Sequence, residues 1–122
     1  MITWNNLDKL ASFQELLDAK RVNLAEVMAG ENGAERVKKY SVPMAEGLAF
    51  NYGAKQVDDA VLEVLAKLAE EAQLTEKYEA LYNGEVINTG EKRLVLHQLT
   101  RGQLGEDVVA DGVNKRDFYV EQ

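Results

Sequence analysis

The sequence predicts a mainly helical fold with a few short strands, and three observations support this class. Apolar residues recur at helical spacing over residues 58–73, the clearest such pattern in the chain. A similar pattern covers residues 4–20. Elsewhere, Gly, Pro, Asn-Gly and Asp-Gly interrupt the chain and leave room only for short strands and turns. A chain of 122 residues has the size of one domain, so we expect residues 1–122 to form a single domain.

The first forty residues predict three helices. Thr3 is placed to cap the first one, over residues 4–20. Asn23 followed by Glu26 resembles a capping box and predicts a short second helix, which Gly30 ends. A third short helix is expected over residues 33–39.

The helical pattern stops near residue 43 and resumes near residue 58. Pro43, the only proline, restricts Val42 to extended geometry. Residues 48–52 lie between two glycines and predict a short strand or extended segment. Asp58 can cap the helix over residues 58–73, with Val57 packing on Leu62 as a hydrophobic staple.

The last third of the chain begins with a helix over residues 75–82, which Asn83-Gly84 ends. Residues 91–101 fit a short buried helix or a buried strand. The helix is favoured, because Gly102 stands where a C′ glycine would and Arg101 suits a last turn. Residues 108–113 predict a hairpin turning at Asp-Gly. Asp117 could cap a further helix that starts at residue 118 and has room for about one turn, as expected of a segment of a longer chain.

Composition excludes several functional classes. The net charge of −7 and pI near 4.7 argue against a nucleic-acid surface, which needs clustered Lys and Arg, and against anionic membranes. Without cysteine there is no disulfide, no cysteine nucleophile and no thiolate metal site. The first residues do not form a signal peptide, and no apolar run reaches the ~20 residues of a membrane span. A cytoplasmic protein is therefore expected.

Few residues suggest chemistry, and for each the structural interpretation is preferred. His97 could be a general base, but a hydrogen-bonded structural histidine is favoured. Arg93 and Arg101 would share a helix face and could bind phosphate, although pairing with a carboxylate such as Glu91, or with a neighbouring domain, is favoured. The remaining candidates are the acidic pairs Asp58/Asp59 and Glu70/Glu71, interpreted as solvated, and the aromatics Phe50, Tyr52, Tyr78 and Tyr82, interpreted as core and interface packing. With no phosphate-binding loop and a single histidine, we expect no catalytic, cofactor-binding or metal-binding residue in this chain.

The segment YNGEVINTGEKRLVLH, residues 82–97, carries a family resemblance. It resembles the pattern G-E-x-I-N-x-x-E-x-R-x-V-L-H of the N-terminal region of bacterial glucose-6-phosphate isomerases. The resemblance extends in register over about residues 4–112. The further matching segments are AERVKKYS (34–41), NYGAK (51–55), the helix of residues 62–74, RLVLHQLTR (93–101) and VADG (109–112). Asn51, Gly53 and Gly102-Gln103 depart from the family pattern, and the last pair removes any role of a second arginine there.

The resemblance implies a specific function for the longer polypeptide. That family isomerises glucose 6-phosphate to fructose 6-phosphate through an enediol, with a glutamate as base and without cofactor. Its catalytic residues lie downstream of the matched region, so this segment is expected to be inactive alone. It would be the mainly helical N-terminal part of an α/β enzyme with sugar-isomerase (SIS-type) domains. Its partners would be the remaining domains and the homodimer mate, with apolar contacts offered by Leu94-Val95-Leu96, Tyr78 and Tyr82.

Two other functions remain open at this point. The chain could be an autonomous non-catalytic helical module that binds another protein. It could also be a sensor that binds sugar phosphate through Arg93 and Arg101.

Overall fold

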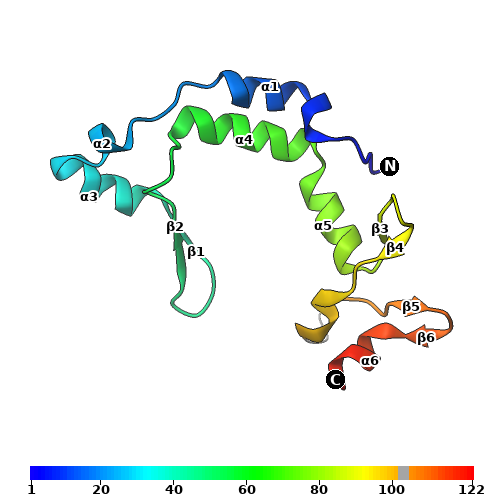
Figure 1. The fold of residues 1–122 in the computed structure, drawn as a ribbon. Helices are drawn as coiled ribbons and strands as arrows, with labels where there is room; N and C mark the ends of the chain where they lie inside the picture. Colours follow the sequence, from blue (N-terminus) through cyan, green and yellow to red (C-terminus); the bar gives the residue numbers. More distant parts are fainter. Residues whose placement is uncertain (102–104) are drawn as a thin grey trace. The chain divides into compact units, whose positions relative to one another are not determined.

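The computed structural model describes residues 1–101 and 105–122 (Figure 1). The chain forms two compact units, one of Ala11–Leu68 and one of Met1–Leu10 with Ala69–Gln122. About half of the described residues are helical, and the strands found among them pair as short antiparallel hairpins. The prediction of a mainly helical fold with a few short strands is thus confirmed, whereas a single domain stays a prediction.

The helices and strands have the following bounds. The α-helices are α1 (Ala11–Asp18), α2 (Leu24–Val27), α3 (Gly30–Lys39), α4 (Asp59–Glu71), α5 (Leu74–Tyr82) and α6 (Lys115–Val120). The 3-10 helices are η1 (Leu7–Lys9) and η2 (His97–Arg101). The strands are β1 (Ser41–Pro43), β2 (Ala49–Asn51), β3 (Val86–Asn88), β4 (Arg93–Leu94), β5 (Val109–Ala110) and β6 (Val113–Asn114). Within the described residues, no helix is both long and apolar enough to cross a membrane.

The predicted first helix is shorter than expected. Asn6 and Leu10 both have extended backbone dihedrals, so η1 is a separate turn and α1 begins only at Ala11. Thr3 does not cap a helix. Its backbone N and its Oγ1 instead donate to Oε1 of Gln73, at 2.8 and 2.9 Å.

The cap predicted for the second helix is confirmed, because Oδ1 of Asn23 accepts from the backbone N of Ala25 at 3.1 Å. The third helix begins at Gly30, earlier than predicted. Helix α2 ends at Val27, before the predicted Gly30, and Gly30, with φ +59°, is instead the first residue of α3. A Cβ on Gly33 would lie 2.3 Å from the carbonyl oxygen of Met28, so glycine is required where the two helices meet.

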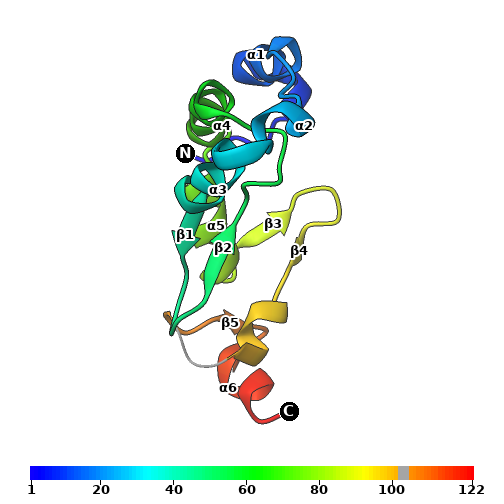
Figure 2. The same cartoon turned by 90° about the vertical axis from the view of Figure 1, so that its left-hand side faces the viewer.

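Strands β1 and β2 form an antiparallel hairpin in which Val42 pairs with Phe50 and Pro43 with Ala49 (Figure 2). The strand predicted at residues 48–52 is confirmed, but its partner β1 was not predicted. Proline is compatible with β1 because this strand lies at the edge of a two-stranded sheet.

The cap of α4 was predicted correctly. Oδ1 of Asp58 accepts from the backbone N of Val61 at 2.9 Å, and the helix begins at Asp59. Helix α5 follows after Gln73, which has φ +53°. The helices predicted for residues 58–73 and 75–82 are therefore both present.

The helix predicted over residues 91–101 is wrong for its first half. Residues 93–94 form β4, which pairs with β3, and only residues 97–101 are helical, as η2. The cause is the turn before β4, where Lys92 has φ +52°, a conformation incompatible with a continuing helix. Gly102, the predicted C′ glycine, lies outside the described residues.

The hairpin predicted at Asp111-Gly112 is confirmed. Asp111 has φ +53° and Gly112 has φ +73°, which are the signs that a type I′ turn requires. The last helix starts at Lys115, earlier than predicted. Its cap is Asn114, whose Oδ1 accepts from the backbone N of Arg116 at 3.1 Å, and Asp117 lies in the first turn rather than at the cap.

Each unit has a small core of its own. The buried apolar residues of the Ala11–Leu68 unit are Tyr40, Val61 and Leu68. Those of the other unit are Ala80, Leu99 and Val108.

Candidate functional site

The segment of residues 84–97 folds as β3, a turn, β4 and the start of η2. The side chain of Asn88 holds the turn, because its Oδ1 accepts from the backbone N of Glu91 at 3.2 Å and its Nδ2 donates to Oε2 of Glu91 at 3.3 Å. Nε of Arg93 lies 3.8 Å from the same Oε2. The predicted pairing of Arg93 with Glu91 is thus confirmed, as an exposed contact that contributes little to stability.

The glycine that opens this segment ends α5. The backbone N of Gly84 donates to the carbonyl of Leu81 at 3.2 Å, and that of Glu85 donates to the carbonyl of Ala80 at 2.9 Å. These two bonds form a Schellman motif, and the φ of +71° at Gly84 fits its C′ position. A Cβ on Gly84 would lie 2.3 Å from Cγ1 of Val108. Both the backbone and the packing therefore require glycine here.

His97 does not have the environment expected of a structural histidine. Its side chain is exposed and makes no hydrogen bond within the described part of the chain, while its carbonyl accepts from Oγ1 of Thr100 at 2.9 Å. The residue is the first of η2, and it borders a pocket of about 240 Å³. The pocket lining is Leu94, Val95, Leu96, His97, Thr100 and Tyr119.

Arg93 and Arg101 do not share a helix face. Arg93 lies in β4 and Arg101 at the end of η2, so the eight-residue helical spacing does not apply to them. Both side chains are exposed.

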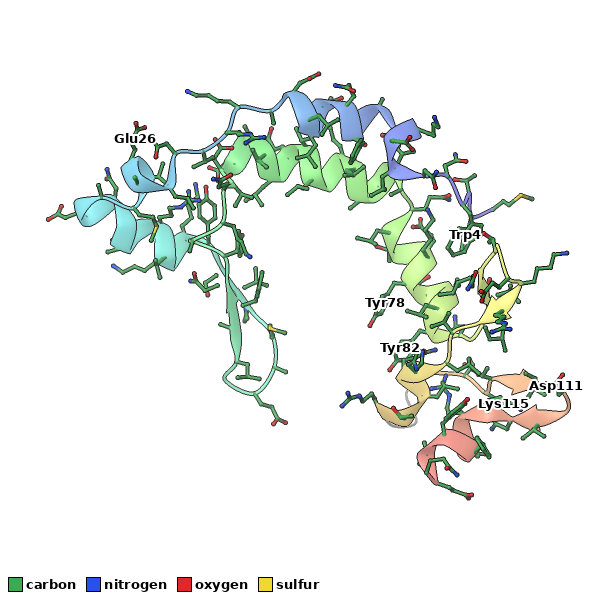
Figure 3. All side chains as sticks on the ribbon, in the orientation of Figure 1. Trp4, Glu26, Tyr78, Tyr82, Asp111 and Lys115 are labelled. Carbon is green, nitrogen blue, oxygen red and sulfur yellow. The ribbon has the colours of Figure 1, made fainter. Side chains whose placement is uncertain are left out.

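The aromatic side chains of α5 lie close to each other. The rings of Tyr78 and Tyr82 are stacked with centroids 6.1 Å apart (Figure 3). Tyr78 is exposed and Tyr82 is half-buried. Nζ of Lys77, on the same helix, lies 5.4 Å from the ring centroid of Trp4.

The most buried charged group of this unit, Arg116, was not predicted. Its side chain is 3% exposed, and its Nε donates to the carbonyl of Glu106 at 2.8 Å. Nη2 donates to the carbonyl of Tyr82 at 3.3 Å, and the guanidinium carbon lies 6.0 Å from the centroid of the same tyrosine ring. Arg116 therefore joins the start of α6 to the end of α5.

The other unit contains a similar arginine that was also not predicted. Nε of Arg36 donates to the carbonyl of Gly53 at 2.7 Å, and its Nη2 donates to the carbonyls of Lys55 and Val57 at 2.9 and 2.5 Å. Its guanidinium carbon lies 4.6 Å from the ring centroid of Tyr40. The side chain thus fixes the loop that leads into α4.

The acidic pair at residues 58 and 59 has structural partners. Asp58 caps α4, while the carboxylate of Asp59 accepts from Nζ of Lys39 at 2.5 Å and from the hydroxyl of Tyr40 at 3.0 Å. The bond from Lys39, then that from Tyr40, lowers the pKa of the Asp59 carboxyl. The same bond raises the pKa of Lys39, and burial is the main cause that raises the pKa of Tyr40. Glu70 and Glu71 are exposed, as expected.

The arrangement of these groups favours structural roles. Among the described residues, no three His, Asp or Glu side chains come together as a metal-ligand set. The shifted pKa values that involve Asp59 and Lys39 have an ion pair as their cause, and the raised pKa of Lys67 likewise comes from its bond to Glu15 at 3.0 Å. Asn88 and Glu91 thus hold a turn, Asp58 caps a helix, and Asp59 forms a surface pair.

Comparison with known proteins adds the family. Residues 51–118 match the family model described as phosphoglucose isomerase. The chain is 52% identical over 124 residues to the glucose-6-phosphate isomerase of Treponema denticola, covering 98% of this chain and 24% of that protein. It is 41% identical over 119 residues to that of Treponema pallidum strain Nichols (97% and 22% covered), and 38% identical over 121 residues to that of Borreliella afzelii (98% and 22% covered). The chain thus spans about a quarter of the length of these curated relatives.

Proposed function

The chain belongs to the phosphoglucose isomerase family, and on that premise we propose that it is the N-terminal, non-catalytic portion of a glucose-6-phosphate isomerase. The observation that carries this proposal is the coverage: 98% of the chain aligns with only 24% of a relative that is 52% identical. The complete enzyme would interconvert glucose 6-phosphate and fructose 6-phosphate through an enediol, in glycolysis and gluconeogenesis.

Under this proposal, residues 1–122 support a subunit whose chemistry lies elsewhere in the polypeptide. The partners are the remaining domains of the same isomerase, of the SIS type, and its homodimer mate. Residues 1–122 would supply no catalytic, cofactor-binding or metal-binding side chain, and the enzyme would act in the cytoplasm. The structural roles of Asn88, Glu91 and Asp59 support this view, because each is already engaged in a turn or a surface pair.

A coupled isomerase assay on the purified chain tests the proposal. We expect no turnover above buffer, because the carboxylates of Asp58, Asp59 and Glu91 are already engaged in a helix cap, a surface pair and a turn rather than directed at a substrate. The control is a chimera in which residues 1–122 replace the corresponding segment of the Treponema denticola relative, and this chimera should be active. Turnover by the chain alone, or an inactive but folded chimera, would overturn the proposal.

The alternative is an autonomous non-catalytic helical module that interacts with another protein. It is favoured by one observation: each unit has its own buried residues and its own buried arginine. Sedimentation separates the two functions, since a segment with an unfilled docking surface tends to self-associate, whereas a module should be a clean monomer or a symmetric dimer.

A third function, a sugar-phosphate sensor that uses Arg93 and Arg101, has less support than the isomerase segment or the autonomous module. Its only support was their shared helix face, and the two residues lie in β4 and η2 instead. Calorimetry with millimolar glucose 6-phosphate would show no heat of binding if the sensor function is wrong.

A further inference from the structure

The hairpin of β1 and β2 presents one apolar face. Val42 pairs with Phe50, and the backbone N of Met44 donates to the carbonyl of Leu48 at 2.9 Å. Because side chains alternate along a strand, these four residues lie on the same face of the hairpin. Their exposed fractions are 47%, 68%, 68% and 52% for residues 42, 44, 48 and 50. We call this set, Val42, Met44, Leu48 and Phe50, the hairpin stripe.

The stripe continues into a groove of the same unit. The groove has a volume of about 350 Å³, and β2 and α4 both contribute to its walls. Its apolar lining is Val42, Phe50, Tyr52, Val57, Leu62 and Leu65. Lys55 is the charged residue at its border, and its ammonium forms no ion pair with any described residue. The surface is therefore apolar with one unpaired positive charge.

Such a surface is unfavourable in water. A two-stranded hairpin has marginal stability unless one face packs against another layer. Each large apolar side chain that becomes buried contributes favourably to folding, so a stripe of four adjacent ones marks a contact surface. The described residues do not bury the stripe.

We infer that the hairpin stripe and its groove are the surface on which the remainder of the isomerase polypeptide docks. This inference rests on the proposed function, because its occupant is the three-quarters of the relatives' length that lies outside the matched region. The docking segment is apolar and carries an Asp or Glu opposite Lys55. The hairpin stripe differs from the contact surface expected from the sequence, which comprised Leu94-Val95-Leu96, Tyr78 and Tyr82. Of these, residues 94–96 are half-buried around their own pocket.

Oxidation of Met44 tests the inference without any substitution. Met44 is exposed in the chain, so peroxide should convert its thioether to the sulfoxide rapidly. In the chimera with the Treponema denticola relative, docking should slow this oxidation by about tenfold or more. Equal rates in the chain and in the active chimera would overturn the inference, while an inactive unsubstituted chimera would instead contradict the proposed function.

The substitution pair V42E/F50E provides the second readout. In the isolated chain both side chains are about half exposed and belong to a hairpin rather than to a helix, so circular dichroism should show the same helix content. In the chimera the pair would bury two unpaired carboxylates, and the yield of soluble, active enzyme should fall by about tenfold or more. L17E is the matched control, because Leu17 is 63% exposed in the same unit but lies outside the stripe. L17E should leave the yield of soluble, active chimera within about twofold of that of the unsubstituted chimera.

Two results would contradict the inference. One is a V42E/F50E chimera as active as the L17E chimera. The other is an isolated chain that dimerises through the stripe, with the dimer lost in V42E/F50E and Met44 still oxidised freely in the active chimera. That outcome would assign the surface to a second copy. Should V42E/F50E fail to fold in isolation, the oxidation rates alone decide.

Discussion

Each unit of the molecule is organised around a buried arginine, and the two arginines differ in how their surroundings are assembled. Arg36 donates to the carbonyls of Gly53, Lys55 and Val57, and its tyrosine, Tyr40, follows one helical turn later, at the C-cap of α3. Arg116 instead donates to carbonyls on segments that precede it in the chain, and its tyrosine, Tyr82, belongs to α5.

The difference shows how an arginine can organise a loop that lacks regular structure. Buried carbonyls need donors, and the guanidinium group supplies five N–H groups in a fixed plane. Around Arg36 the helix itself places Tyr40 beneath the guanidinium, at 4.6 Å. Around Arg116 the corresponding distance is 6.0 Å, at the limit of a cation–π contact, and the arrangement depends on a residue far away in sequence. The Arg36 site should therefore be the stronger of the two.

The largest expected effect follows from R36M in the isolated chain. Methionine keeps most of the side-chain length but leaves the buried carbonyl of Gly53 and the partly buried carbonyls of Lys55 and Val57 without this donor, which should lower the free energy of unfolding by about 3 kcal/mol. Urea denaturation followed by circular dichroism measures it. R36K should recover only part of the loss, because one ammonium cannot match the planar donor set. A loss below about 1 kcal/mol would show that water replaces the guanidinium.

The second-largest effect is expected from R116M, which should lower the free energy of unfolding by about 2 kcal/mol in the same urea experiment. Amide exchange should also accelerate next to Tyr82, where the lost bond joined α5 to α6. An effect larger than that of R36M would reverse the comparison, and would mean that pre-organisation by a neighbouring helical residue matters little.

G84A should lower the free energy of unfolding by about 2 kcal/mol in urea denaturation, since alanine disfavours φ +71° and its Cβ would collide with Val108. G112A is the matched control. It has φ +73° but nothing within 4 Å of the added Cβ, so it should lose only the conformational part, about 1 kcal/mol. Equal losses in the two variants would show that Val108 moves aside without penalty. The comparison therefore measures how tightly the end of α5, beside the Arg116 site, is packed.

The smallest effect concerns the pair of Asp59 and Lys39 beside the Arg36 site. The lowered pKa of Asp59 means that its stabilisation is present above the ordinary carboxyl pKa of 3.8 and is lost as the pH falls through the lowered value. The raised pKa of Lys39 means that the stabilisation contributed by its ammonium is present below the ordinary lysine pKa of 10.5 and is lost as the pH rises through the raised pKa. D59N should thus lower the urea midpoint slightly at pH 7, and the difference from the parent chain should shrink as the pH falls through the lowered pKa of Asp59. A difference that does not shrink as the pH is lowered would exclude the ion pair as its cause.

Local chemistry explains which elements the sequence predicts well. The cap at Asp58 and the turn at Asp111-Gly112 depend on residues next to each other, and both are present as predicted. Strands β1 and β3 were not predicted, and for β4 the strand alternative was left open but the helix was favoured. The reason is that a strand of two or three residues is defined by its pairing partner, which residue patterns do not identify. The apolar run at residues 94–96 fits either structure until the turn at Lys92 is known.

The buried arginines could not be predicted for a related reason. Their partners are backbone carbonyls, which every residue carries, so no residue type marks the site. The one available signal was the spacing of Arg36 and Tyr40, four residues apart at the end of a predicted helix, which allows a contact between the two side chains. His97 was expected to be hydrogen-bonded because histidines in apolar segments usually are, yet the segment turns it outward.

Pro43 has a consequence for how the hairpin behaves at high concentration. The backbone N of Met44 donates to the carbonyl of Leu48, and that of Tyr52 donates to the carbonyl of Tyr40. These bonds identify the residues whose backbone groups point toward the other strand of the hairpin. Backbone groups along an antiparallel strand point alternately toward and away from the partner strand. Pro43 lies between residues that bond across the hairpin, so its nitrogen points away from β2, toward the outer edge of β1 where a strand of another molecule would pair. Proline has no hydrogen to offer there. The chain can thus keep an apolar face ready for docking while this edge resists growth into fibrils.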